Sequence, residues 1–344
     1  MIISFNPQLF QTDDEAIQKN VAELLVLLLG TNHFLEITDI DTFFFDKDKF
    51  IFRENNIAKN FLSKKHIVDL EKWISSIISK SSYITNLKKK HLSSVKIGNE
   101  VEEIIPSNAV RIIKERSKVI VENGINDWNF IKGICAKYES HKLRGGIYQL
   151  INTAIKEEIL EADNAGGIGE IIKRVNLWIE DRYKDIYKLK LIAIFDSDRI
   201  SSLVFDTHKE IIAFFKNKER NAIQDTDYVY QTDDIILWHI LYKRKLENYL
   251  PLSVMLVKLK TISPAQKTAL ESKTPNELDF IDYDNSIVGL RKNQIKDQFP
   301  KMFLENFSYR DLERRCEHHL FWSEETGSEI SEFEQILLKI AKII

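Results

Sequence analysis

Two short apolar runs that end abruptly at carboxylates constrain the fold of this chain more than any other feature. Val119–Val121 precedes Glu122, and Leu191–Phe195 precedes Asp196 and Asp198. β-branched runs of this length are typical of buried strands in a parallel sheet, and strand and helix signals alternate around them. We therefore expect an α/β fold with a Rossmann-like, mainly parallel sheet flanked by helices.

The carboxylates that follow these runs predict a binding site. Ligands of open α/β sheets gather at the carboxyl ends of the strands. In a strand, residues two apart share a face, so Asp196 and Asp198 point together while Ser197 points away. Together with Glu122 they offer hard oxygen ligands, which suit Mg²⁺ or Mn²⁺ better than zinc. A strand-end turn or a helix cap is the alternative interpretation of the acidic residues.

The length of the chain predicts more than one domain. At 344 residues it exceeds one comfortable core. We expect an α+β domain over 1–108, a catalytic domain over 109–255 and a mostly helical region over 256–344. The polar segment from Lys88 to Glu103, closed by Pro106, marks the first boundary.

Local patterns predict the individual elements. In the first domain, Asp13 or Asp14 caps a helix that ends at Gly30, residues 43–52 form a hairpin, and a helix carries Ile67 through Ile78. In the middle region, strands are expected over 118–122, 189–195 and 235–242. Helices are expected over 127–139, 146–161 and 207–219, and another begins after Gly166-Gly167.

Composition excludes several classes of protein. Hydrophobic residues make up 44% and charged residues 29%, which is ordinary for a soluble protein. The longest apolar run, Leu24–Leu29, is too short to cross a bilayer, and no secretory signal opens the chain. With only Cys135 and Cys316, a disulfide framework and a zinc ribbon are excluded. We expect a cytoplasmic protein that does not contact membranes.

At this point the acidic pattern resembles a known family. Glu122 after one strand, and Asp196 and Asp198 after a later one, are similar to the glutamate and the Asp-x-Asp pair of the TOPRIM (topoisomerase–primase) domain. Gly166-Gly167 lies where many members have a glycine turn, and the resemblance covers roughly residues 115–250. Members usually have glycine directly after the glutamate, whereas here Asn123 precedes the glycine.

A second segment is similar to one subgroup of that family. Lys243–Pro251 resembles the basic–Glu-Asn-Tyr-Leu segment of standalone TOPRIM nucleases of bacterial defence systems, relatives of the OLD family that work with an ABC-type ATPase. The resemblance implies that Glu247 joins the metal ligands and that Lys243 and Arg244 contact the scissile phosphate. The alternatives are a surface ion pair between Glu247 and Arg244, and basic residues that are merely solvated.

Other candidate residues have equally good structural interpretations. Asp127 either completes a second metal site or caps the helix that follows it. Gly166 and Gly167 either present amides to a phosphate or form a turn that needs positive φ. No Gly-Lys-Ser/Thr follows a glycine cluster, so the chain should not hydrolyse ATP by itself. The adjacent His318 and His319 are not expected to bind metal.

These observations predict a nuclease. Glu122, Asp196, Asp198, Glu247 and Lys243 would hydrolyse phosphodiester bonds with two Mg²⁺ or Mn²⁺ ions. The substrate is DNA or a structured RNA such as tRNA, although a net charge of −3 provides no global basic field. The resemblance implies a toxic anti-phage effector controlled by a partner ATPase. A ribosomal-RNA-processing ribonuclease and a non-catalytic TOPRIM scaffold are the alternatives, and a homo-oligomer is left open.

Overall fold

The structure is a computed structural model in which two compact units are distinguished. The described residues are 1–36, 45–46, 49, 51–52, 55–79, 86–201, 206–258, 262–283, 298–305 and 307–344. The first unit is Met1–Arg116 with Lys342–Ile344, and the second is Ser117–Ala341. The boundary therefore follows residue 116 instead of 108. The region from residue 256 to Ala341 belongs to the second unit rather than forming a domain of its own.

The first unit is built on a parallel sheet of three strands in the order β2-β1-β5. Ile3 of β1 pairs with Leu35 of β2 on one side and Val95 of β5 on the other. As expected, Asp14 caps α1 by accepting hydrogen bonds from two backbone amides, and α1 ends at Gly30. The elements are β1 (Ile2–Phe5), α1 (Glu15–Leu29), β2 (Phe34–Leu35), β3 (Phe45–Asp46), β4 (Ile51–Phe52), α3 (Asn56–Phe61), α4 (Lys64–Ser79), α5 (Asn86–His91), β5 (Ser94–Ile97) and α6 (Pro106–Lys114).

Two expectations for this unit were wrong and one was confirmed in part. The polar segment expected to be a domain boundary contains β5, whose alternating exposed and buried residues pair with β1 inside the unit. Because α1 connects parallel strands, the unit is α/β rather than α+β. The expected hairpin is present as Phe45 paired with Phe52 and Asp46 paired with Ile51, while 43, 44, 47, 48 and 50 lie outside the described residues.

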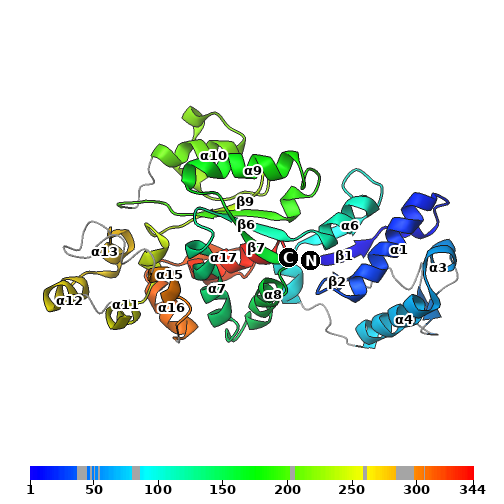
Figure 1. Cartoon of the computed structure of the whole chain (residues 1–344), viewed down its shortest axis with the longest axis horizontal. Coiled ribbons are helices and arrows are strands. Elements are labelled where there is room, and N and C mark those ends of the chain that lie inside the picture. Colours follow the sequence, from blue (N-terminus) through cyan, green and yellow to red (C-terminus); the bar gives the residue numbers. More distant parts are fainter. Residues whose placement is uncertain are drawn as a thin grey trace. The chain divides into compact units, whose positions relative to one another are not determined.

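The second unit contains the expected parallel sheet, with four strands in the order β7-β6-β8-β9. Helices α9 and α10 lie on one face, and α7, α8 and α17 lie on the other (Figure 1). This three-layer arrangement places the apolar side chains of β6 and β8 in the core, where Val119–Val121 are fully buried. The elements up to residue 240 are β6 (Ser117–Val121), α7 (Asn126–Tyr138), α8 (Gly145–Lys156), β7 (Leu160–Asn164), α9 (Ile171–Glu180), β8 (Leu191–Phe195), α10 (Lys209–Lys216) and β9 (Leu237–Ile240).

Most of the expected elements of this unit are confirmed, with one error. The helix expected over 146–161 ends at Lys156, and the next residues form β7, an edge strand beside β6. Glu158, at φ +57°, and a backbone hydrogen bond from Ile159 to Ala154 separate the helix from the strand. The strand was overlooked because Ile155, Ile159 and Leu160 continue the apolar pattern of the helix.

The C-terminal region of the second unit is mostly helical and covers one side of the sheet. Its last helix packs Phe333, Ile336, Leu337 and Ile340 into the core. The elements are α11 (Leu252–Lys258), α12 (Pro264–Glu271), α13 (Pro275–Phe280), α15 (Phe299–Met302), α16 (Tyr309–Cys316), the antiparallel pair β10 (Phe321–Ser323) and β11 (Ser328–Ile330), and α17 (Glu332–Ala341). Among the described residues, no helix has the length and apolar character needed to span a membrane.

Candidate metal centre

The site begins where two neighbouring strands end. β6 and β8 are hydrogen-bonded in parallel, with Ile120 opposite Ala193. Glu122 follows β6 and Asp196 follows β8, so both lie at the carboxyl edge of the sheet. The Oε1 atom of Glu122 accepts a hydrogen bond of 3.0 Å from the backbone N–H of Asp196. Residues 74 positions apart in the chain are therefore in direct contact.

The electrostatics of the carboxyl groups indicate that the site is larger than this pair. The pKa of Glu122 is raised to about 7, mainly by burial and also by the charges of Asp127 and Asp198, against the hydrogen bond from Asp196. Burial also raises the pKa of Asp127 to about 7, and Glu247 contributes repulsion. These effects need the five carboxyl groups to lie close together at one edge of the sheet.

Asp196 is at the centre of this group. Burial raises its pKa well above the ordinary value, and the charges of Glu122, Glu247, Asp127 and Asp198 add to the effect in that order. Its Oδ1 atom accepts a hydrogen bond of 3.2 Å from the backbone N–H of Leu246. Asp196 thus links the strand ends to the segment that follows β9.

The segment after β9 also holds the second aspartate. Asp198 has a φ of +51°, in the left-handed region, and its N–H donates to the carbonyl of Arg244 at 2.9 Å. Ser197 points away from the carboxylates, as expected, because its buried hydroxyl donates to the carbonyl of Lys243 at 2.8 Å. The Nζ of Lys245 lies 3.6 Å from a carboxylate oxygen of Asp198.

Only one residue of the basic triplet, Lys245, reaches the carboxylates, and it is neither of the two expected at the phosphate. Lys243 has only 1% of its side chain exposed, and its Nζ lies 2.5 Å from Oδ1 of Asp279. Arg244 forms its ion pair with Asp282, at 3.0 Å. The alternative expectation, an ion pair between Arg244 and Glu247, is therefore also wrong. Burial in these pairs removes Lys243 from the site. Lys245, which sequence reasoning did not single out, carries the nearby positive charge.

Arg244 binds the backbone of the turn at Asp198 instead of facing a substrate. Its Nη1 atom donates to the backbone carbonyls of Asp198, at 3.4 Å, and Arg199, at 3.3 Å. These bonds stabilise the left-handed turn at Asp198. A role as a phosphate contact is not supported by this orientation.

The loop after Glu122 explains the displaced glycine. The side chain of Asn123 accepts hydrogen bonds from the amides of Ile125 and Asn126 and so caps the start of α7. A Cβ on Gly124 would lie 2.8 Å from the Cβ of Asn164 at the end of β7, and the Gly124 N–H donates to Asn164 Oδ1 at 3.1 Å. Glycine is therefore needed at position 124 because the loop passes against β7 there.

The same loop positions Asp127 for a role other than capping. Asp127 lies in the first turn of α7, and its Oδ2 atom accepts a hydrogen bond of 2.8 Å from the N–H of Asn123. Because Asp127 lies inside the first turn of α7, it is not the residue before the helix, and the cap interpretation of Asp127 is wrong. Its carboxylate turns back toward Glu122.

The glycine turn holds Glu122 in place. Gly166 and Gly167 have φ values of +88° and +133°, which favour glycine. The N–H of Gly166 donates to the backbone carbonyl of Glu122 at 3.1 Å and to Asn164 Oδ1 at 3.1 Å. Of the two amides expected to bind phosphate, that of Gly166 is therefore engaged within the protein. The turn needs positive φ, which was the alternative interpretation.

The donor set fits a hard divalent cation, but the ligand atoms are not gathered tightly. Carboxylate oxygens are the usual ligands of Mg²⁺ and Mn²⁺. Yet within the described part of the chain, the one group of three candidate ligands whose atoms lie within 4.8 Å of one another is elsewhere. For three of the five carboxylates to share one ion, at least one of their side chains would have to move.

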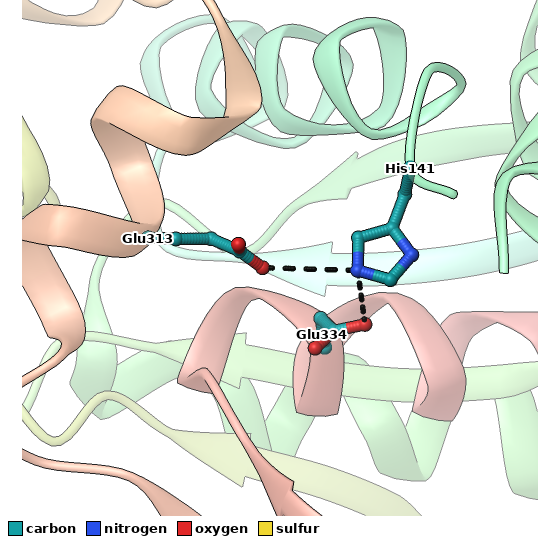
Figure 2. Close-up of side chains that lie close together, drawn as sticks. All are labelled: His141, Glu313 and Glu334. Carbon is teal, nitrogen blue, oxygen red and sulfur yellow. Dashed lines mark ion pairs between the residues drawn. The ribbon is translucent and has the colours of Figure 1, made fainter. Parts of the chain in front are cut away.

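That other group is His141, Glu313 and Glu334, which come from three separate segments of the second unit (Figure 2). Glu334 is 3% exposed and accepts hydrogen bonds of 2.7 Å from Arg144 Nε and the Tyr148 hydroxyl. A guanidinium already neutralises this carboxylate. Because a cation would have to displace Arg144, we interpret the group as a buried ion pair of the core.

The two histidines near the C-terminal end have structural partners. His318 Nε2 lies 2.7 Å from Asp279, and His319 stacks on Tyr242 with ring centroids 3.6 Å apart. Neither belongs to the group of candidate metal ligands.

Comparison of the whole chain with protein-family models, curated proteins and solved structures finds no match.

Proposed function

We propose that this chain is a divalent-metal-dependent nuclease whose centre is formed by Glu122, Asp127, Asp196, Asp198 and Glu247. The observation that carries the proposal is the hydrogen bond from the Asp196 amide to the Glu122 carboxylate, because it joins the ends of two adjacent parallel strands. The raised pKa of Glu122 and of Asp127, each to about 7, supports it. Crowded carboxylates of this kind favour a bound cation.

In this proposal, some residues of the centre bind the ions and others position the site or the substrate. A pair of divalent ions supplies an activated water, a clamp on the phosphate oxygens and relief of charge on the leaving oxygen. Glu122 and Asp196 hold their positions through the hydrogen bond between them. Lys245, 3.6 Å from Asp198, would supply positive charge to a non-bridging phosphate oxygen.

The biological role in this proposal rests on the resemblance to defence-system TOPRIM nucleases. It comprises a toxic anti-phage effector, a DNA or tRNA substrate, and control by an ABC-type ATPase. The acidic centre is compatible with either nucleic acid, since phosphodiester hydrolysis is the same chemistry in both.

A direct test compares cleavage by matched variants. The purified chain is incubated with plasmid DNA and with total tRNA, in Mn²⁺ or Mg²⁺, with and without a cognate ATPase. Asp196→Asn keeps the size and one acceptor of the side chain but removes the charge, and should abolish cleavage. Asp13→Asn removes an exposed charge in the first unit and serves as the matched control. Cleavage by Asp196→Asn at the wild-type rate would refute the proposal.

One observation favours the alternative of a non-catalytic scaffold. Among the described residues, no three of the five carboxylates have ligand atoms within 4.8 Å of one another. A scaffold derived from a nuclease would retain the fold and lose the compact ligand set. It would bind a partner but cleave neither substrate under any of the conditions above.

A further inference from the structure

A pocket of about 330 Å³ lies in the second unit, beside the candidate metal centre and separate from it. Its volume is in the range of small-molecule sites, which begins at roughly 300 Å³. Strand β9, helix α17 and the segment from Asp225 to Tyr230 provide most of the wall, and Arg199, Tyr242 and Phe321 provide the rest. None of the five carboxylates of the centre lines it.

The walls combine aromatic rings with a buried cation. The aromatic residues of the lining are Tyr228, Tyr230, Trp238, Tyr242 and Phe321. The guanidinium carbon of Arg199 lies 5.3 Å from the ring centroid of Tyr242. Rings of this kind stack on planar ligands, and a guanidinium is a good partner for a phosphate.

Two polar atoms of the lining lack partners among the described residues. The Nε of Arg199 and the hydroxyl of Tyr228 are buried, and neither makes a hydrogen bond there. Buried donors without acceptors are unfavourable, so such atoms in a pocket wall indicate a ligand that supplies acceptors.

Glu332 is the buried acidic residue of the wall, and its carboxylate is held by three hydrogen bonds. Glu332 accepts a hydrogen bond of 2.8 Å from His239 Nε2, 2.6 Å from the Tyr242 amide and 2.5 Å from the Tyr249 hydroxyl. Lys339 Nζ lies 3.0 Å from His239 Nδ1 and adds positive charge nearby. These three donors are uncharged, because Lys339 donates to the other ring nitrogen of His239 and keeps the ring neutral. Glu332 therefore keeps its negative charge, and the positive charges of Arg199 and Lys339 in the lining offset it.

The pocket and the metal centre share two segments of the chain. Arg199 directly follows Asp198, and Arg244 donates to the carbonyls of both. Tyr242 of the pocket lies three residues before Lys245, which pairs with Asp198. A polymer that reaches the centre would therefore pass close to the pocket.

We propose that this pocket binds a nucleotide, with its base among the tyrosine rings and its phosphate at Arg199. The proposal rests on the proposed function in one respect, namely that the nucleotide is the neighbour of the scissile phosphate in a DNA or RNA strand. It adds a site for the base, which the acidic centre alone does not provide.

The test measures binding without any divalent ion. AMP, GMP, CMP and UMP are titrated calorimetrically into the full chain in EDTA, and at least one should bind saturably at one site. Val229 lines the pocket and is 65% exposed, so substitutions there should fold. Val229→Glu should weaken binding by about fivefold through repulsion of the phosphate, whereas Val229→Lys should not weaken it. Thermal melting verifies that both variants fold.

Further arms identify the part of the ligand that is recognised. Arg199→Gln should reduce the affinity for a nucleotide to that for the nucleoside, while Arg310→Gln, at an exposed position outside the pocket, should leave it unchanged. No saturable binding, or equal binding by the Val229 pair, would overturn the proposal.

A single-stranded oligonucleotide distinguishes a polymer from a free nucleotide. It should displace bound AMP from the chain in EDTA. Failure to displace AMP would contradict the position next to the scissile phosphate and assign the pocket to a free nucleotide. Binding without any cleavage would refute the nuclease and retain the pocket, whereas cleavage without binding would refute the pocket alone.

Discussion

At the scale of single residues, the central feature is the crowding of carboxyl groups at one edge of the sheet. Glu122 and Asp127 both have a pKa raised to about 7, with burial as the first cause. The folded chain therefore holds protons more tightly than the unfolded chain. Without divalent ions, the free energy of unfolding should fall as the pH rises from about 4 to about 7, because both groups lose those protons.

Glu122→Gln tests this pH dependence. Glutamine keeps the oxygen that accepts from the Asp196 amide and removes the charge. In EDTA at pH 8, the substitution should increase the free energy of unfolding by about 1–2 kcal/mol, and at pH 5 it should change it little. Urea denaturation at the two pH values measures the difference. A destabilisation of the same size at both would contradict the account.

The two lysines that flank Arg244 should behave in opposite ways. Lys243→Met breaks a buried pair with Asp279 and should cost about 3 kcal/mol of stability. Lys245→Met removes a partly exposed pair with Asp198, so it should cost less than about 1 kcal/mol. Lys245→Met should instead slow cleavage. Denaturation and cleavage rates of the two variants, measured side by side, check both statements, and the reverse pattern would contradict them.

At the scale of elements, the turn between β6 and α7 depends on a close approach to β7. Gly124→Ala would place a Cβ 2.8 Å from Asn164 Cβ and should destabilise the chain by about 1–3 kcal/mol. Gly146→Ala is the matched control, because a Cβ there meets nothing within 4 Å and alanine favours the helix. Chemical denaturation of both variants compares them. Equal stability of Gly124→Ala and the wild type would show that the approach is not tight.

The elements also show which parts of the structure a sequence can reveal. The β6 and β8 strands were predictable because a short, continuous run of β-branched residues rarely forms any other kind of buried element. β7 was missed because its polar residues and the preceding isoleucines continue a helical pattern. β5 was missed because four alternating residues in a polar segment look like a loop.

The site was predictable only as far as strand ends determine it. The positions of Glu122, Asp196 and Asp198 follow from the sheet. Which lysine faces the carboxylates depends on Asp279, which attracts Lys243 into the core from a distant segment. The residues around Lys243 in the sequence give no indication of this pairing with Asp279. The pocket was equally hidden, because its walls come from segments spread over residues 199–339.

At the scale of the whole molecule, a bound cation should stabilise the fold. An ion that binds the folded state alone adds a free energy that grows with its concentration, about 2.7 kcal/mol at one hundred times the dissociation constant. Mn²⁺ should therefore raise the melting temperature of the wild type. It should raise that of Asp196→Asn much less, although that variant keeps the His141, Glu313 and Glu334 group. An equal shift in both would place the ion elsewhere.

The most direct test is a crystal structure of the chain grown with Mn²⁺ and measured for anomalous scattering. The account predicts an anomalous peak bonded to oxygens of Glu122 and Asp196 at about 2.2 Å, with Asp127, Asp198 or Glu247 completing the ligands. A peak only at His141, Glu313 and Glu334, or no peak at saturating Mn²⁺, would contradict it.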